Sequence, residues 1–412
     1  MLEINKIYNM DCLEGLKLLD DNSVDSIVTD PPYELGFMGK KWDSTGIAYN
    51  VELWKECLRV LKPGGHLLAF GGTRTYHRMA CAIEDAGFEI RDCIQWIYGG
   101  GFPKSHDISK AIDKQAGAER KVIGKSSRHG GGIKGNGTSY ELPPDIPYIT
   151  APATPEAQQW DGWGTALKPA HEPIVVARKP ISEKTIAENV LKWGTGGINI
   201  DDCRIAYDMS DTNPATNPLY RKENGYKTNY GIDSNPSAYA LKKEAGTMNI
   251  NNQGRFPANV ILDEETGKIL DEQSGIRPSG KGNGNAKVGV ATNGQGVPPL
   301  RRGKLVPRND TGGASRFFYC AKASKKERGE GNNHPTVKPL SLIKYLITLV
   351  TPPGGICLDP FEGSGTHALA CEELGFNYIG FELDKEYYEI AKNRINKHII
   401  DNNLQGKYSL IT

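Results

Sequence analysis

The sequence predicts an α/β fold in which a doubly wound, mostly parallel sheet is built from the N-terminal and C-terminal parts of the chain. An irregular lobe is expected between these parts. Three observations lead to this prediction. Strand and helix patterns alternate near both ends of the chain, as in βαβ units, while the middle shows no sustained period. Proline- or glycine-rich motifs follow apolar runs at 26–29 and 356–358, and ligands bind at such strand ends.

The N-terminal part shows strand and helix patterns in turn. A strand is expected at 6–10, followed by a helix at 12–19 in which Leu13, Leu16 and Leu19 have helical spacing. The apolar run at 26–29 is expected to be a buried strand that ends at Asp30. The elements expected after it are a helix at 51–61 that a Pro-Gly-Gly turn ends, a strand at 66–70, a helix at 75–85 and a strand at 88–98.

The alternation stops after the three glycines at 99–101. Residues 102–168 are polar and glycine-rich and are expected to be a loop-rich insertion. The run at 172–178 is expected to be a strand that pairs with the strand before the insertion and closes an edge of the sheet. No period is sustained from 180 to about 330. Order returns with helices expected at 340–350, 367–374 and 385–399 and strands at 356–358 and 378–381, which suggests domain segments at 1–180, 181–330 and 331–412.

Composition narrows the class of protein. The net charge of +1 over 412 residues gives no global basic field, so a nucleic acid partner would need a local basic patch. The eight cysteines form no C-x-x-C pair, so neither a zinc site nor a disulfide framework is expected. The chain has no secretory signal pattern and no apolar run of membrane-spanning length. We therefore expect a soluble, cytoplasmic protein without a metal.

The motif Asp30-Pro31-Pro32-Tyr33 follows the buried strand and has the groups to hold an amino group. The prolines stiffen the backbone and extend the residue before them. The Asp30 carboxylate and the Pro31 carbonyl offer two acceptors, which match the two donors of a planar –NH2 group. Tyr33 offers an aromatic face on which a base can stack. The alternative is a strand followed by a proline turn with a surface tyrosine.

A second motif, residues 359–366, lies between an expected strand and helix and contains Gly363 and Gly365. Glycines let a ligand approach the backbone, and the helix after them offers free N–H groups. Glu382 ends the next strand, where an acidic residue commonly binds ribose hydroxyls. This arrangement indicates a nucleoside site, although the alternative of a tight βα turn stays open. A nucleotide-binding oxidoreductase would need a longer glycine fingerprint than the one present.

Together these residues resemble the amino-group DNA methyltransferases that use S-adenosylmethionine. Residues 30–33 resemble their catalytic motif, and residues 359–366 resemble their cofactor motif, here called the cofactor turn. Residues 334–339 resemble the motif that precedes the cofactor motif in the β group, whose motif order this chain shares. The resemblance covers roughly residues 1–100, 165–180 and 330–400. It implies a Rossmann-like methyltransferase sheet, with residues 181–330 as the target-recognition region.

The resemblance also implies roles for individual residues. Asp30, Pro31, Pro32 and Tyr33 would be catalytic. Glu382 would bind the ribose and Asp11 the adenine ring of the cofactor, although Asp11 needs no ligand if it is a helix N-cap. Asp359 would lie near the methionine end, which His334, Thr336 and Lys338 would bracket. The other cofactor-binding residues implied are Phe361, Gly363, Ser364, Gly365 and Thr366.

The implied reaction is methylation of the exocyclic amino group of a base that is flipped out of double-stranded DNA. An Asp at position 30 favours adenine, because cytosine-amino enzymes often carry Ser there. The alternatives are a cytosine-N4 enzyme and a non-catalytic DNA-binding protein on the same scaffold. A homodimer and a cognate restriction enzyme are partners that the resemblance leaves open. Lys40, Lys41 and Trp42 follow the catalytic motif and are candidates for a mobile lid over the base. The other candidate DNA contacts, which would hold phosphates or belong to a solvated loop, are Arg301, Arg302, Lys304 and Arg308.

Overall fold

The computed structural model describes residues 2–36, 41–101, 105–125, 148–206, 254–278, 311–322, 332–334, 336–405 and 407–411. The chain divides into two compact units. Unit 1 comprises Met1–Asn199, Asn259–Thr266 and Cys320–Thr412, and unit 2 comprises Ile200–Ala258 and Gly267–Tyr319. The N-terminal and C-terminal parts of the chain therefore fold together in unit 1, as the sequence predicted.

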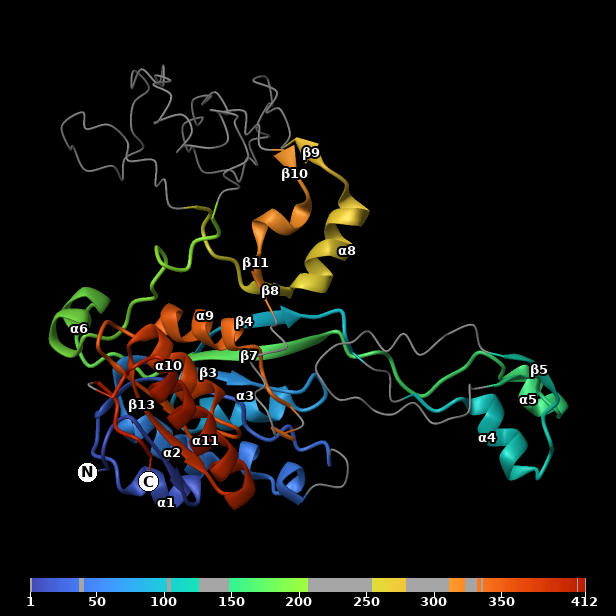
Figure 1. Cartoon of the computed structure of the whole chain (residues 1–412), viewed down its shortest axis with the longest axis horizontal. Helices are drawn as coiled ribbons and strands as arrows, with labels where there is room; N and C mark the ends of the chain where they lie inside the picture. Colours follow the sequence, from blue (N-terminus) through green and yellow to red (C-terminus); the bar gives the residue numbers. More distant parts are fainter. Residues whose placement is uncertain are drawn as a thin grey trace, which may run out of the picture. The chain divides into compact units, whose positions relative to one another are not determined.

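Unit 1 is built on a nine-stranded sheet (Figure 1). Its spatial order is β1 (Lys6–Asn9), β13 (Asn377–Glu382), β12 (Ile356–Asp359), β2 (Val24–Thr29), β3 (Leu61–Phe70), β7 (His171–Arg178), β4 (Glu89–Ile97), β8 (Val260–Asp263) and β11 (Tyr319–Ala321). The pairs from β1 to β3 are all parallel, which confirms the doubly wound α/β prediction. β7 is antiparallel to both β3 and β4. It pairs with β4 as predicted, but the prediction that it closes an edge was wrong, because it lies between two strands.

Helices cover both faces of this sheet (Figure 1). The helices α1 (Cys12–Lys17), α2 (Val51–Val60) and α3 (Tyr76–Asp85) share one buried cluster with alternate strand residues. Those strand residues include Ile27, Leu67, Ala69, Val175, Ala177, Leu358, Ile379 and Phe381. The intervening residues, such as Val28 and Leu68, are buried as well. Burial on both faces explains why the strands appear as short continuous apolar runs.

The helices α9 (Leu340–Val350), α10 (Thr366–Leu374) and α11 (Lys385–Asp401) pack next to one another along the C-terminal part. A further helix, α6 (Ile186–Trp193), packs beside β3. Among the described residues, no helix combines the length and apolar character that crossing a membrane requires. All eight cysteines are free thiols.

The N-terminal and C-terminal parts meet between β2 and β12. These strands pair in parallel with Ile27 opposite Leu358, and the Ile356 N–H donates to Asp25 Oδ2 over 2.8 Å. At the far end, Thr29 Oγ1 donates to Asp359 Oδ1 over 2.6 Å. Because parallel strands end at the same edge of a sheet, the segments after Thr29 and after Asp359 are neighbours. Strand order also reverses here, which is where α/β sheets bind ligands.

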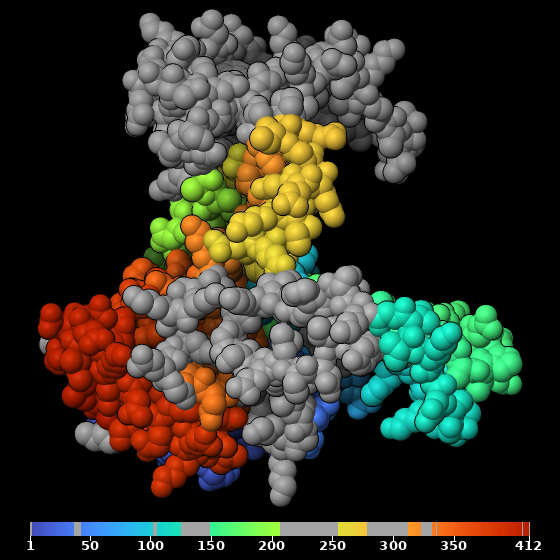
Figure 2. Space-filling model, turned by 45° about the vertical axis from the view of Figure 1, so that its right-hand side comes forward, coloured from blue at the N-terminus to red at the C-terminus, as the bar shows by residue number. Residues whose placement is uncertain are grey.

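The insertion at 102–168 contains more regular structure than its composition predicted. It holds α4 (Ile108–Gln115), β5 (Val122–Lys125), β6 (Tyr148–Thr150) and α5 (Pro155–Gln159), and Figure 2 shows α4 and α5 together as a turquoise and green lobe. A buried polar centre joins these elements. Asp113 accepts hydrogen bonds from Arg120 Nη1 at 2.6 Å and from the Thr154 backbone at 3.0 Å. Hydrophobic periodicity cannot detect a lobe held together in this way.

The region 181–330 also contains helices that the sequence did not predict. They include α6 and α8 (Glu264–Ser274), a helix with few apolar residues. α6 begins at a capping box in which Thr185 Oγ1 accepts the Glu188 N–H and Glu188 Oε2 accepts the Thr185 N–H. The strand β8 in this range joins the sheet of unit 1. In unit 2, β9 (Arg277–Pro278) pairs with β10 (Thr311–Gly312).

Candidate active site

A cavity of about 1410 Å³ lies in unit 1 at the edge where β2, β12 and β13 end. It is larger than the roughly 300–1,000 Å³ typical of a pocket for one small ligand, so it has room for a nucleoside cofactor and a target base. Both sequence motifs line it. The predicted site residues in its wall are Asp11, Asp30, Pro31, Pro32, Tyr33, His334, Thr336, Lys338, Asp359, Phe361, Gly363, Ser364, Thr366 and Glu382.

Glu382 joins the cofactor turn to the end of β13. Its Oε2 accepts the Gly363 N–H over 2.8 Å, and its Oε1 accepts the Asp384 N–H over 2.7 Å. Burial raises the pKa of Glu382 to about 7, even though these two hydrogen bonds favour the carboxylate. Each carboxylate oxygen has a second lone pair. Glu382 can therefore accept ligand hydroxyls while it fixes the turn, which is the chemistry of a ribose site.

The two glycines of the turn serve different purposes. Gly363 has a φ of +59°, and a Cβ there would lie 3.3 Å from His334 Nε2. Gly363 therefore lets His334 approach the turn within the cavity wall. Gly365 has a φ of +84°, and its Cβ would lie 3.0 Å from the Ala391 Cβ. Gly365 is not among the residues that line the cavity; it was predicted to bind the cofactor, but it allows α10 to start against α11.

Asp359 braces both motifs from the end of β12. Its Oδ1 accepts the Thr29 hydroxyl over 2.6 Å and the Phe361 N–H over 2.9 Å. Burial and, to a lesser extent, the nearby Glu362 charge raise the pKa of Asp359 to about 8. The sequence predicted Asp359 near the methionine end of the cofactor. The structure places it in the cavity wall, where it holds the cofactor turn against the end of β2, the strand that precedes Asp30.

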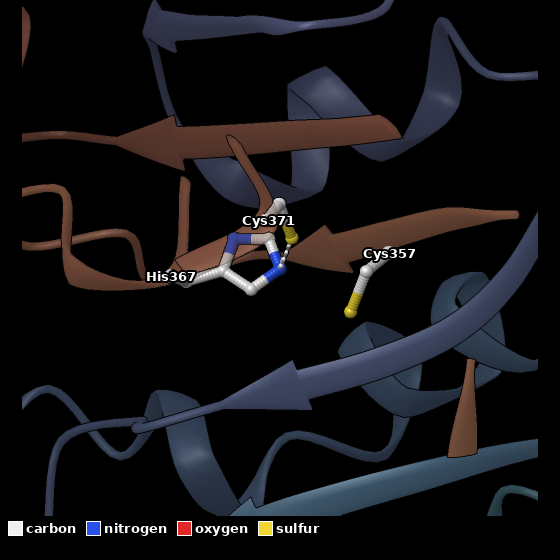
Figure 3. A group of neighbouring side chains, drawn as sticks. All are labelled: Cys357, His367 and Cys371. Atoms are coloured by element: carbon white, nitrogen blue, oxygen red, sulfur yellow. Dashed lines mark hydrogen bonds between the residues drawn. The ribbon is translucent and has the colours of Figure 1, made fainter. Parts of the chain in front are cut away.

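A buried cluster of Cys357, His367 and Cys371 lies beside the cofactor turn (Figure 3). Its three ligand atoms are within 4.8 Å of one another. Glu362 Oε2 lies 3.0 Å from His367 Nδ1, and Cys371 Sγ lies 3.6 Å from His367 Nε2. Three such groups are one fewer than the four ligands usual in a structural zinc site. The sequence could not reveal this cluster, because the residues have no metal-site spacing.

Asp30 has two carboxylate oxygens in different environments. Its Oδ2 accepts a hydrogen bond from Lys338 Nζ over 2.6 Å. Its Oδ1 is shielded from solvent, and no residue that the structure describes donates a hydrogen bond to it. Burial raises the pKa of Asp30, although the Lys338 charge opposes this shift. The unpartnered oxygen is the acceptor that an amino group in the cavity would require.

Tyr33 is fixed at both its hydroxyl and its backbone. The hydroxyl donates to Glu172 Oε2 over 2.8 Å, and the carbonyl accepts Thr75 Oγ1 over 2.8 Å. The Lys338 ammonium lies 5.2 Å from the centre of the Tyr33 ring. The sequence predicted that Lys338 brackets the methionine moiety, whereas the structure pairs its ammonium with Asp30. The catalytic motif is therefore held, through its side chains and its backbone, from three distant parts of the chain.

Sequence reasoning missed Glu172 as a site residue. It found the strand at 172–178 but had no reason to place that strand's first residues at the active edge. Because β7 runs antiparallel to β3, it begins where β3 ends, with Ile174 opposite Phe70. Glu172 consequently lies in the cavity wall beside Tyr33. The signal that could have found it is an acidic residue at the start of an antiparallel strand, but strand direction is not readable from the sequence.

Asp11 is the N-cap of α1. Its Oδ1 accepts the Leu13 N–H over 2.9 Å and the Glu14 N–H over 3.3 Å. The capping alternative is therefore realised, and Asp11 also lines the cavity. We expect Asp11→Ala to lower the free energy of unfolding by about 1 kcal/mol, the usual loss for an N-cap. Urea denaturation followed by circular dichroism measures this, and an unchanged midpoint would contradict the capping role.

Most of the predicted DNA contacts cannot be placed. Lys40 and the four basic residues Arg301, Arg302, Lys304 and Arg308 lie outside the described residues. Lys41 and Trp42 begin the short 3-10 helix η2 (Lys41–Ser44), but their side chains also lie outside the described part. These contacts stay predictions.

Comparison with known proteins gives consistent matches. The family model N6_N4_Mtase, described as DNA methylase, matches residues 24–393. The type II methyltransferase M.HindIII of Haemophilus influenzae is 24% identical over 435 aligned positions, which cover 95% of each chain. The type II methyltransferase M.HpaI of Haemophilus parainfluenzae is 41% identical over 81 residues, 20% of this chain and 24% of that protein. A crystal structure of the M1.HpyAVI–SAM complex aligns with 94% of this chain and 98% of that chain at 18% identity, with a TM-score of 0.38.

Proposed function

Because this chain belongs to the N6_N4_Mtase family of DNA methylases, we propose that it transfers a methyl group from S-adenosylmethionine to the N6 amino group of an adenine in DNA. That it is a methyltransferase acting on amino groups of DNA follows from the family. The choice of adenine is our proposal and is supported by Asp30, since the resembling cytosine enzymes often carry Ser at this position. The alternative target is the N4 amino group of cytosine, which presents the same two donors.

One observation carries the proposal. The unpartnered Oδ1 of Asp30 and the Glu382 carboxylate line the same cavity. The donor set in its wall fits S-adenosylmethionine: Glu382 is suited to ribose hydroxyls, and the backbone at Gly363 permits close approach. When bound, this cofactor supplies a methyl group made electrophilic by its positively charged sulfur. The residues that would hold it are Asp11, His334, Thr336, Phe361, Gly363, Ser364, Thr366 and Glu382.

The residues of the catalytic motif would act on the target amino group. Asp30 Oδ1 and the Pro31 carbonyl accept its two N–H bonds, which turns the nitrogen lone pair away from them and toward the methyl donor. As the nitrogen gains the methyl group it must lose one proton, and Asp30 Oδ1 is in position to accept it. Positioning of this kind is a large source of rate enhancement and needs no protein nucleophile. The base must leave the duplex to reach the cavity.

The target base is tested by methylating DNA with the purified enzyme and digesting it to nucleosides for mass spectrometry. We expect N6-methyladenine. N4-methylcytosine would overturn the adenine proposal and keep the amino-methyltransferase assignment. Single-molecule sequencing of DNA from a host that expresses the protein would give the recognition site from the same reaction.

The affinity for S-adenosylmethionine should fall below neutral pH. Glu382, whose pKa is raised by burial to about 7, must be ionised to accept ribose hydroxyls. Below its pKa a proton has to leave before the cofactor binds, so Kd should rise by up to about tenfold per pH unit. Calorimetry in buffers of different ionisation enthalpy should detect this proton release near pH 6. Asp359 also titrates in the cavity wall, so it has to be excluded as the source of this proton. An Asp359→Asn variant should still release the proton, which assigns it to Glu382.

The remaining assignments concern partners and regions. We infer that the protein works in the cytoplasm, where its DNA substrate is found. Residues 181–330, which contain unit 2, are proposed as the target-recognition region. A cognate restriction enzyme, a homodimer and the absence of a metal requirement stay predictions. Size-exclusion chromatography with light scattering would establish the oligomeric state.

A further inference from the structure

We propose that Lys338 and Glu172 are positioning residues for methyl transfer, and that they hold Asp30 so that only its Oδ1 is available to the target amino group. This inference rests on the proposed function and assigns the residues that orient its catalytic carboxylate. It gives Lys338 a different role from the methionine contact that the family resemblance implies. It also brings in Glu172, which that resemblance does not mention.

The contacts form a closed network around the Lys338 ammonium. Lys338 Nζ lies 2.6 Å from Asp30 Oδ2 and 3.4 Å from Glu172 Oε2. Glu172 Oε2 also accepts the Tyr33 hydroxyl over 2.8 Å. The Lys338 side chain is 8% exposed, and its ammonium lies 5.0 Å from the centre of the Phe70 ring. One oxygen of Asp30 is thereby occupied, and the plane of the carboxylate is fixed relative to Tyr33.

The charges of this network do not balance. Two carboxylates, Asp30 and Glu172, surround one ammonium, and burial keeps the neighbouring Tyr33 and Tyr98 protonated by raising the pKa of both, that of Tyr98 to about 12. With both carboxylates ionised, the network carries one net negative charge. An ion pair between Asp30 and Lys338 that served stability alone would not need Glu172 beside it, because desolvating an uncompensated charge is costly. In the cavity wall, the surplus charge is suited to a cofactor that brings one positive charge.

The two residues should shift the acid limb of the pH profile of kcat/KM in opposite directions. Measured for DNA at saturating S-adenosylmethionine, so that Glu382 is already ionised, this limb reports the ionisation of an essential base in the enzyme–cofactor complex, which is Asp30 under this proposal. Lys338→Met removes a positive charge and raises the pKa of Asp30, so the limb should move to higher pH. Glu172→Gln removes a negative charge and lowers that pKa, so the limb should move to lower pH. We also expect kcat to fall about 100-fold in Lys338→Met, as when a reacting group is misplaced.

A second measurement needs neither cofactor nor DNA. In Lys338→Met the partly buried carboxylates of Asp30 and Glu172 lose their counter-charge, so the ligand-free protein should melt at a lower temperature than wild type. This deficit should grow as the pH rises and Asp30 ionises. Adding Asp30→Asn should restore much of the lost melting temperature, because it removes the uncompensated charge. Affinity for S-adenosylmethionine, measured by calorimetry, should not weaken in Lys338→Met.

Matched controls come from another lysine–glutamate pair. Lys344 Nζ lies 2.7 Å from Glu373 Oε2, and neither residue lines the cavity. Lys344→Met and Glu373→Gln should leave the pH profile unchanged. Acid limbs that do not separate, or a tenfold loss of cofactor affinity in Lys338→Met, would overturn the positioning role. Wild-type enzyme that methylates no base would instead overturn the proposed function.

Discussion

Replacing Asp30 by alanine should lower the rate of methyl transfer by about 1,000-fold or more, comparable to losing both an electrostatic contact and a proton acceptor. The variant loses Oδ1, the buried carboxylate oxygen to which no described residue donates. It also leaves the Lys338 ammonium without its nearest partner, 2.6 Å away. Transfer of a radiolabelled methyl group to DNA under single-turnover conditions measures the effect directly.

Cofactor binding should survive the same substitution. The groups expected to hold the cofactor belong to the turn after β12 and to Glu382, and the hydrogen bonds that fix the turn run to Asp359 and Glu382 instead of Asp30. We expect the Kd for S-adenosylmethionine in Asp30→Ala to stay within about threefold of wild type, since only long-range charge terms change. The exposed Asp21, which pairs with Arg59, provides a matched control, and Asp21→Ala should retain full activity. A fully active Asp30→Ala enzyme would refute the catalytic role of this carboxylate.

The sequence predicted the arrangement on which this expectation rests. The apolar runs before Asp30 and before Asp359 are short, continuous and followed by turn residues, and both are buried strands that pair in parallel in one sheet. Sheet topology then requires their ends to meet. The same reasoning placed Glu382 correctly, because a third parallel strand, β13, ends at that edge.

The parts that sequence reasoning missed depend on tertiary contacts. Glu172 reaches the site only because β7 is antiparallel to β3. The direction of a strand cannot be read from the hydrophobic periodicity of the sequence. Lys338 belongs to a recognised motif, but the choice between a cofactor carboxylate and Asp30 as its partner depends on how residues 336–339 pack. Gly365 lies in the expected turn, yet the close approach of Ala391 explains why it is glycine. In each case the sequence shows the residue itself. It does not show which residue, some tens or hundreds of positions away, lies beside it in the fold.

The second large effect is expected on the cofactor side. Glu382→Ala should weaken S-adenosylmethionine binding by about 100-fold or more, which corresponds to roughly 2.7 kcal/mol. Hydrogen bonds to a charged group contribute about 1.5–3 kcal/mol each, and two ribose hydroxyls would lose theirs. The Gly363 and Asp384 N–H groups would also lose their acceptor, so the turn itself should loosen. Calorimetric titration of the purified protein gives the affinity without any DNA.

Glutamine should not replace Glu382. This expectation distinguishes a specific need for two acceptor oxygens from a general need for a polar side chain at this position. Both oxygens of Glu382 accept backbone N–H groups, at 2.8 Å from Gly363 and 2.7 Å from Asp384. A glutamine would direct its own NH2 group at one of these donors, so Glu382→Gln should bind the cofactor nearly as weakly as Glu382→Ala. The half-exposed Glu389 on α11 supplies the control, since Glu389→Ala should bind normally. Wild-type affinity in Glu382→Gln would show that the carboxylate neither fixes the turn nor binds the ribose.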